Sequence, residues 1–256
     1  MLLRCVDPFN FRMADGRLLS VDELASLEPA ATCTVLLPAA FSSITSIMVG
    51  AGEAALLRKT LPWRLEESLL SSPETLHFAH SAVSDGRAAV TLVDRSALQQ
   101  VRSNLTAAGI VPAEIHADLS LVPWQPRHWS VWVDQHNNSE LLVRHGWHQG
   151  FACTVTNLAS ALTLLQNEQQ SWPEQIVFYG SREQAAAVQA VLPAPLQNLF
   201  AIRKQPGWEE LLNAQTTPCN VLQGSFAPPL PWQRWRQEWR LAAGLLVALL
   251  LIDGIL

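Results

Sequence analysis

The chain alternates short apolar runs with longer amphipathic stretches from its first residue to about residue 213. The short runs are rich in β-branched residues or alternate apolar with polar positions, and both patterns predict β-strands. In the first half these runs are Met1–Val6, Arg17–Leu19, Thr32–Leu37, Ser43–Val49, Thr75–Val83, Ala88–Val93 and Ala113–Ala117. In the second half they are Trp129–Asp134, Glu140–His145, Trp147–Thr154, Gln175–Tyr179 and Leu199–Arg203.

The stretches between these runs carry helix-end signals. Ser20-Val-Asp-Glu23 is a capping box that predicts a short helix to near Glu28, and Asp94 predicts the cap of a helix ended by Gly109. A leucine-rich helix is predicted to open at Gly50, with a kink or break at Pro62. Further helices are predicted at Thr156–Asn167, Ser181–Val191 and Trp208–Asn213. Because both halves mix strands with helices, we predict an α/β or α+β protein with a boundary near residue 120.

The last residues, Leu241–Leu256, form an apolar run interrupted only by Asp253 and small residues. A helix of this length covers roughly 24 Å, against the roughly 30 Å of a bilayer core. A buried C-terminal helix is the alternative, but Leu245–Ile252 has no polar face for solvent. We therefore predict the start of a transmembrane helix, in a native chain that continues beyond it.

Aromatic and basic residues precede this apolar run. Trp232, Trp235 and Trp239 recur at helical spacing, as expected at a membrane–water interface. Basic residues flank only the N-terminal end of the run, which predicts that residues 1 to about 230 are cytoplasmic. These basic residues are Arg234, Arg236 and Arg240.

Composition and charge argue against some classes of function. The net charge is −5, and no basic stripe precedes residue 230, so nucleic acid is not an expected partner. The four cysteines are scattered without a Cys-x-x-Cys pair, which fits reduced thiols in the cytoplasm.

Two motifs permit a ligand site but favour a plainer interpretation. Gly50-Ala-Gly-Glu-Ala-Ala55 matches a dinucleotide-binding turn, yet Glu53 would bring negative charge to that site, and a plain strand-to-helix turn is favoured. His145 and His148, with His136 and Cys153 nearby, have spacing that zinc could use. An orienting carboxylate is not evident, so packed or surface histidines are the favoured interpretation.

Signatures of catalysis are missing from the sequence. It contains neither G-x-x-x-x-G-K-[ST] nor G-x-S-x-G. Glu66 and Glu67 are adjacent on a predicted helix and therefore point in different directions, which favours a solvated face over a catalytic pair. We predict that the chain has no catalytic, cofactor or metal residues.

The stretch Leu61-Pro62-Trp63-Arg64-Leu65-Glu66-Glu67, followed by His77-Phe78, resembles protein L of the bacterial type II secretion system, also called general secretory pathway protein L. Further stretches agree in the same order along the chain. They are Val93-Asp94-Arg95, Ala117-Asp118-Leu119 and Asn220-Val-Leu-Gln-Gly224-Ser-Phe226.

The resemblance implies an α/β cytoplasmic domain with the two-lobed, RNase H-like fold of actin-type ATPases, followed by a single inner-membrane span. It further implies that the cytoplasmic domain holds the secretion ATPase, the E component, without chemistry of its own. The span and a periplasmic part would pair with the M component and a second copy of the chain. Asp253 is then expected to face such a neighbouring span, because a carboxyl in a membrane usually faces a partner helix or water.

Actin-type ATPases hold nucleotide with glycine-rich turns, and the matching positions here depart from that pattern. They read Val6-Asp7-Pro8-Phe9-Asn10, Val133-Asp134 to Asn138-Ser139, and Phe178-Tyr179-Gly180-Ser181. Pro8 and bulky side chains stand where backbone N–H groups should face phosphate, so the nucleotide site is predicted to be degenerate. Asp7 and Asp134 retain the chemistry for a metal ion.

The sequence thus predicts a non-enzymatic adaptor of the secretion platform. The alternative is a membrane-tethered protein of the actin-like superfamily that binds or hydrolyses a nucleotide between its lobes. The predicted organisation is lobe 1 (1–120), lobe 2 with a return segment (121–225), a juxtamembrane Trp/Arg segment (226–240) and the start of the span (241–256).

Overall fold

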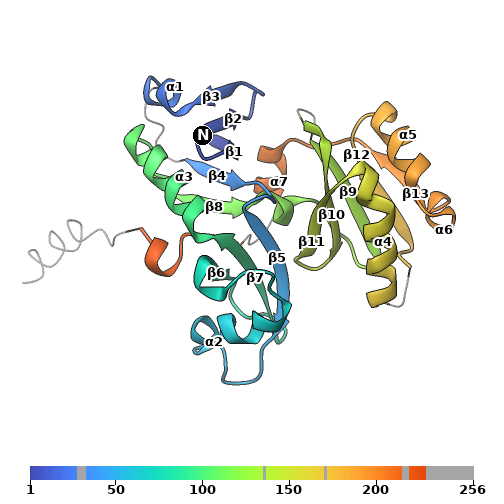
Figure 1. Ribbon diagram of the computed structural model, residues 1–256, viewed down its shortest axis with the longest axis horizontal. Coiled ribbons are helices and arrows are strands. Elements are labelled where there is room, and N and C mark those ends of the chain that lie inside the picture. The colour runs from blue at the N-terminus through green and yellow to red at the C-terminus, as the bar shows by residue number, and fades with distance from the viewer. Residues whose placement is uncertain (28–32, 135–136, 170–171, 215–218, 229–256) are drawn as a thin grey trace, which may run out of the picture. The chain divides into compact units, whose positions relative to one another are not determined.

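Two β-sheets organise residues Met1–Leu222 in the computed structural model of this protein (Figure 1). The structure describes residues 1–27, 33–134, 137–169, 172–214 and 219–228. A second compact unit, Gln223–Leu256, is separate from the first. Its described part, 223–228, contains the short 3₁₀ helix Gly224–Phe226.

The first sheet has the order β3-β2-β1-β4-β8. Its central strand β1 runs antiparallel to β2 and parallel to β4, which is in turn parallel to β8. Strand β2 pairs antiparallel with β3. The bounds are β1 Leu2–Asp7, β2 Asn10–Met13, β3 Leu18–Ser20, β4 Thr34–Leu37 and β8 Glu114–Ala117.

The second half of the chain repeats this topology. Strand β9 runs antiparallel to β10 and parallel to β12, β10 pairs antiparallel with β11, and β12 pairs parallel with β13. The order β11-β10-β9-β12-β13 therefore corresponds strand by strand to the first sheet. Two such repeats are the architecture predicted for an actin-like fold. The bounds are β9 His128–Asp134, β10 Asn137–Gly146, β11 Gln149–Thr154, β12 Gln175–Tyr179 and β13 Phe200–Arg203.

Three antiparallel strands inserted between β4 and β8 extend the second sheet. They are β5 (Ser42–Met48), β6 (Leu76–His80) and β7 (Arg87–Asp94), in the spatial order β5-β7-β6. Strand β5 meets β11 through one residue pair, Gly150 with Ile44. A Cβ atom at Gly150 would lie 2.5 Å from the carbonyl oxygen of Val143, so only glycine fits this position without a backbone shift.

Three helices begin at side-chain caps. Ser20 and Glu23 form the predicted capping box of α1, and Asp94 accepts the backbone N–H of Ala97 at the start of α3. Ser181 and Gln184 form a second capping box at α5. The helices are α1 Val21–Ala25, α2 Leu57–Leu65, α3 Arg95–Ala107, α4 Val155–Gln169, α5 Arg182–Val191, α6 Ala194–Gln197 and α7 Trp208–Ala214. The 3₁₀ helices of this unit are Glu66–Ser68, Pro73–Thr75 and Asp118–Leu121.

Three clusters stand out among the buried apolar side chains of the described residues. One lies between strands β9, β10 and β12 and helices α4 and α5, where Leu158 and Phe178 are fully buried. A second packs α2 against β7 through Leu57 and Leu61. The third, which includes Leu36, Trp132 and Leu142, takes side chains from both repeats and so joins them.

A return segment at residues 219–222 packs on the first half of the chain. The N–H of Val221 donates to the carbonyl oxygen of Ile115 in β8 at 2.7 Å, and the side-chain oxygen of Asn220 accepts the N–H of Ile115 at 3.1 Å. Val221 and Cys219 are buried. The predicted return segment therefore closes the fold against β8.

Several local predictions need correction or fall outside the description. The leucine-rich helix begins at Leu57, because residues 50–56 form turns, and it passes through Pro62 without a break. Strand β2 and helix α6 had no clear signal in the sequence. The change from the first repeat to the second falls between Leu121 and His128. Residues 229–256, with the predicted span, lie outside the described residues, and no described helix is long and apolar enough to cross a membrane.

A candidate functional site at the ends of β1 and β9

Strands β1 and β9 occupy equivalent places in the two repeats, and both end at an aspartate. Asp7 pairs with Asn10 across a tight hairpin, and Asp134 of β9 pairs with Asn137 of β10. These are two of the positions predicted from actin-type ATPases to face nucleotide phosphates. The Asp-x-x-Asn pattern repeated at these positions is the signal in the sequence from which the internal repeat could have been predicted.

The first hairpin is closed on itself. The carboxylate of Asp7 accepts the backbone N–H of Phe9 at 2.8 Å and the side-chain amide of Asn10 at 2.9 Å. Asp7 is therefore engaged by its own turn, and Pro8 contributes no N–H to a ligand. As the sequence predicts, this hairpin does not have the geometry of a glycine-rich phosphate loop.

The third predicted position, Gly180, leads from β12 into α5. The first turn of α5 is capped by its own side chains, since Ser181 Oγ accepts the N–H of Gln184 at 3.2 Å. A Cβ atom at Gly180 would lie 2.8 Å from the ring of Phe178, so this glycine allows close packing of the strand and the helix.

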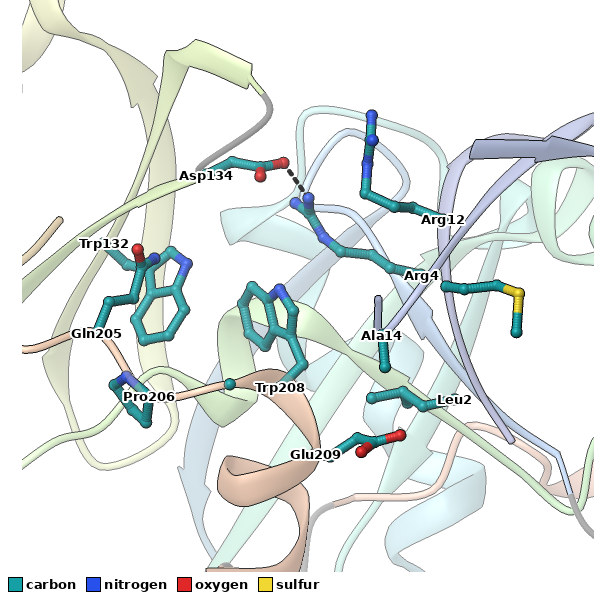
Figure 2. A pocket seen from close by; sticks show the side chains of 12 residues that line it. Leu2, Arg4, Arg12, Ala14, Trp132, Asp134, Gln205, Pro206, Trp208 and Glu209 are labelled. Atoms are coloured by element: carbon teal, nitrogen blue, oxygen red, sulfur yellow. Dashed lines mark hydrogen bonds and ion pairs between the residues drawn. The ribbon is translucent and has the colours of Figure 1, made fainter. Parts of the chain in front are cut away.

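Asp134 at the end of β9 is bonded to a buried arginine. The guanidinium of Arg4, from the middle of β1, donates to Asp134 through Nη1 (Figure 2). It also donates to Asp118 through Nη2 at 2.8 Å. The side chains of Arg4 and Asp118 are 8% and 0% exposed. An ion cluster of one cation and two carboxylates, Arg4–Asp118–Asp134, thus links the two repeats.

The charges in this ion cluster shift one another's protonation. Burial alone would lower the pKa of Arg4, but the two carboxylates outweigh burial and raise it, so Arg4 remains charged. Burial raises the pKa of Asp118, and Arg4 opposes that shift. Burial also raises the pKa of the half-buried Glu140, with Asp118 adding to the effect.

A small cavity of about 160 Å³ adjoins the ion cluster. Trp208 lies between Arg4 and Trp132, with the Arg4 guanidinium 5.4 Å from its ring centroid and the two indole rings 4.8 Å apart (Figure 2). Gln205 and Pro206 close the other side. Ligand sites usually measure about 300–1,000 Å³, so this cavity is small for a nucleotide.

The other residues considered from the sequence lie elsewhere. Glu53 accepts the backbone N–H of Gly50 at 3.1 Å and pairs with Arg64, so a carboxylate already occupies the glycine turn. His145 packs on Phe151, and His148 lies 3.3 Å from the hydroxyl of Thr91. No group of three His, Cys, Asp or Glu side chains suited to a metal ion is found among the described residues, which do not include His136.

The family motif on α2 contains both buried and exposed side chains. Leu61 and Leu65 are buried against β7, whereas Trp63 is 78% exposed. Glu66 and Glu67 are exposed in the following 3₁₀ helix, as the solvated-face interpretation predicts. The predicted membrane-interface residues, Trp232, Arg234, Trp235, Arg236, Trp239 and Arg240, and the predicted intramembrane Asp253 lie outside the described residues.

Comparison with known proteins decides the family. The model of the type II secretion system protein L family matches residues 11–229. The chain belongs to this family. Protein L of Vibrio cholerae is 30% identical over 92% of this chain and 58% of its own length, and that of Pseudomonas aeruginosa is 26% identical over 86% and 52%. The chain thus spans about half the length of these curated relatives.

Solved structures give the same fold. The cytoplasmic domain of EpsL, an inner-membrane component of the type II secretion system of Vibrio cholerae, aligns with a TM-score of 0.62 and 21% identity. That alignment covers 88% of this chain and 98% of the EpsL domain. A PilM–PilN type IV pilus biogenesis complex aligns with a TM-score of 0.50 at 13% identity, over 82% of this chain and 88% of the other.

Proposed function

We propose that this secretion-system component is a non-enzymatic adaptor that recruits the cytoplasmic secretion ATPase to an inner-membrane platform. The observation that carries the proposal is the Arg4–Asp118–Asp134 ion cluster. It places a guanidinium on the aspartate where an actin-type enzyme would need a free carboxylate for its metal ion and nucleotide. A scaffold of this kind binds a partner on its surface and leaves its inter-lobe cleft without a ligand.

The competing proposal is nucleotide binding or hydrolysis in that cleft. Three features count against it: the self-capped hairpin at Asp7, the small cavity beside Trp208, and the bond between Asp134 and Arg4. Calorimetric titration of the full chain with ATP and Mg²⁺ is expected to give no binding tighter than about 1 mM, equivalent to about −4 kcal/mol. Micromolar binding that Asp134→Asn abolishes would establish the competing function instead.

The membrane part of the proposal rests on the sequence. We propose a single inner-membrane span starting at Leu241, a cytoplasmic N-terminal domain, and pairing of the span with the M component and a second copy of the chain. The tryptophans and arginines between Trp232 and Arg240 support this orientation. Asp253 is the proposed contact with a neighbouring span, to be tested by cysteine cross-linking at positions 249–255 in membranes. Labelling that is uniform around the helix would contradict such a contact.

For the ATPase we propose docking on the outward face of α2. Trp63 lies on the face of α2 turned away from the buried Leu57, Leu61 and Leu65, and Leu56 immediately precedes the helix. Leu56 is 56% exposed and Trp63 78%, and Met48, at the end of β5, is 62% exposed. Arg64 anchors α2 to β5 by donating to the carbonyl oxygen of Met48. A rigid apolar surface with a large aromatic residue is typical of a protein contact.

The test is a binding measurement between the full chain and the N-terminal region of the cognate secretion ATPase. Trp63→Ala is expected to weaken binding about tenfold or more, because a central aromatic residue often contributes 2 kcal/mol or more, while unfolding stability changes by less than about 0.5 kcal/mol. Leu164→Ala, at a residue on α4 that is 69% exposed, is the matched control and should bind normally. Equal binding by both variants would exclude the α2 face, and the absence of any binding by the unchanged chain would contradict the adaptor function itself.

A further inference from the structure

A buried arginine without an acidic partner lies in a second cavity, away from the ion cluster. Arg144 on β10 is 7% exposed, and its Nη1 donates to the carbonyl oxygens of Ser120 and Val122, both at 2.7 Å. Among the described residues no carboxylate pairs with it. Burial lowers the pKa of Arg144 to about 10, so it still carries its charge at neutral pH. A buried cation ordinarily requires a negative partner.

The unused side of the guanidinium is suited to a bidentate anion. With Nη1 bonded to carbonyl groups, Nε and Nη2 remain, and their N–H bonds on that edge are parallel. The Nε atom is buried and has no hydrogen-bond acceptor among the described residues. Two parallel N–H donors match the two oxygen atoms of one carboxylate.

The cavity beside this edge has a second unsatisfied donor. Its volume is about 510 Å³, within the size range of small-molecule sites. Trp124 lines it, and the buried indole N–H of Trp124 has no acceptor in the described part of the chain. Trp147, Leu121 and Leu211 supply apolar and aromatic walls. The cavity therefore offers N–H donors for an anionic group and apolar walls for the rest of the ligand.

The charges that line the cavity restrict the charge of the ligand that it can bind. His148 also lines the cavity, and burial, with Arg144 adding to the effect, lowers its pKa to about 3, so it is neutral near pH 7. One buried positive charge balances one negative charge, whereas a phosphate dianion would leave an excess. His148 is held at φ 52, a backbone conformation that is uncommon for residues other than glycine and is found at ligand sites.

We propose that Arg144 and Trp124 form a binding site for a small organic monocarboxylate with an apolar or aromatic body. The carboxylate oxygens accept from Nε and Nη2 of Arg144, and the body lies against Trp147 and Leu211. The site is separate from the proposed docking face of α2, so it does not rest on the proposed function.

The test uses the full chain and calorimetric titration with phenylacetate, phenylacetamide, acetate and inorganic phosphate. Phenylacetate is expected to bind at one site, while phenylacetamide, which has the same shape without the charge, binds at least about tenfold more weakly, since a charge-assisted hydrogen bond contributes about 1.5–3 kcal/mol. Acetate lacks the body and is expected to bind more weakly than phenylacetate. Phosphate binding as tight as that of phenylacetate would overturn the choice of a monocarboxylate.

Variants then locate the site. Arg144→Gln is expected to abolish phenylacetate binding, and the matched control Arg182→Gln, at an exposed residue on α5, should leave it unchanged. Because Arg144→Gln also removes two hydrogen bonds to the backbone, Trp124→Phe provides a second test that keeps an aromatic side chain and removes the N–H donor. A loss of affinity of about threefold to tenfold is expected, from a hydrogen bond of about 1 kcal/mol. No binding of phenylacetate at 10 mM by the unchanged chain, or unchanged affinity in both cavity variants, would refute the site.

Discussion

The Nε2 atom of His77 lies 2.8 Å from the carbonyl oxygen of Val221, a residue 144 positions further along the chain. His77 belongs to β6 and is 5% exposed, and Val221 is fully buried in the return segment. Burial lowers the pKa of His77, so the ring is held neutral with its Nε2–H donated to the carbonyl group. The family stretches around His77-Phe78 and Asn220-Val221 are thus in contact, although the sequence separates them widely.

The return segment is expected to be part of the folding unit. A chain ending at Leu222 should unfold cooperatively, whereas a chain ending at Ala214 should lose at least about 3 kcal/mol, because it exposes the surfaces that bury Cys219, Val221 and Leu222. Urea unfolding followed by circular dichroism measures both. Equal stability of the two truncated proteins would show that residues 219–222 add nothing to the fold.

The Arg4–Asp118–Asp134 ion cluster should be costly to break from one side. Arg4→Met removes the cation bonded to both buried carboxylates and is expected to reduce the free energy of unfolding by about 3–5 kcal/mol. Adding Asp118→Asn and Asp134→Asn removes the uncompensated charge and should recover much of that loss. Chemical denaturation of the single and triple variants checks this interpretation.

The control for this prediction is the exposed ion pair of Arg17 and Asp15, whose side chains are 60% and 52% exposed. Arg17→Met should change the free energy of unfolding by less than about 1 kcal/mol, because exposed ion pairs contribute little. A triple variant at the ion cluster that is no more stable than Arg4→Met would mean that lost packing of Arg4, rather than unpaired charge, accounts for the effect.

Acid should destabilise the protein through His148. Its pKa is about 3 in the folded state, below the unfolded value of about 6.5, so the unfolded chain binds the proton more strongly. The stability is therefore full above pH 6.5 and decreases as the pH falls toward 3. At pH 5 the loss from this residue is about 2 kcal/mol relative to pH 8.

His148→Asn is the variant that tests this pH dependence, because asparagine tolerates a positive φ and does not titrate. The decrease in unfolding free energy between pH 6.5 and 4 should be shallower in this variant than in the unchanged chain. His145, whose pKa burial lowers to about 4, will keep part of the slope. An identical slope in the two proteins would exclude His148 as its source.

The close approach of β11 to β10 should depend on Gly150. Gly150→Ala places a methyl group 2.5 Å from the carbonyl oxygen of Val143, and the backbone must shift, at an expected cost of about 1–3 kcal/mol. Gly207→Ala is the matched control, since nothing lies within 4 Å of the added atom there. Thermal unfolding of both variants provides the comparison, and a melting temperature unchanged by Gly150→Ala would contradict the close approach.

Local signals in the sequence predicted most of the elements correctly, because their causes are local. The capping residues Ser20, Asp94 and Ser181 bond within one turn of their own helices, and the apolar runs of β9, β12 and β7 are long enough to identify. The turn at residues 50–56 was mistaken for helix because alanine and leucine favour helices, whereas Glu53 instead bonds back to Gly50 and to Arg64.

The site depends on distances along the chain that local patterns do not report. Arg4 bonds to residues 114 and 130 positions away, and nothing in the run Met1–Val6 marks its arginine as buried. The family resemblance pointed to Asp7 and Asp134, but the partner of Asp134 was found only in the structure. Arg144 was missed for the same reason, since its neighbours Ser120 and Val122 come from a different element.

The pairing of Ile44 with Gly150 has a consequence for the order in which this protein can fold as it is synthesised. Strand β5 has its partner β7 soon after synthesis, but its other edge remains open until β11 has left the ribosome. Arg4 likewise cannot bond to Asp134, and His77 cannot bond to Val221, until these later residues have been synthesised. The first half of the chain is therefore synthesised early, but it gains its last contacts only after the second half has been synthesised. Throughout that interval we expect it to expose the open edge of β5 and the charge of Arg4, which is buried in the complete fold. Protection by a chaperone would then matter most.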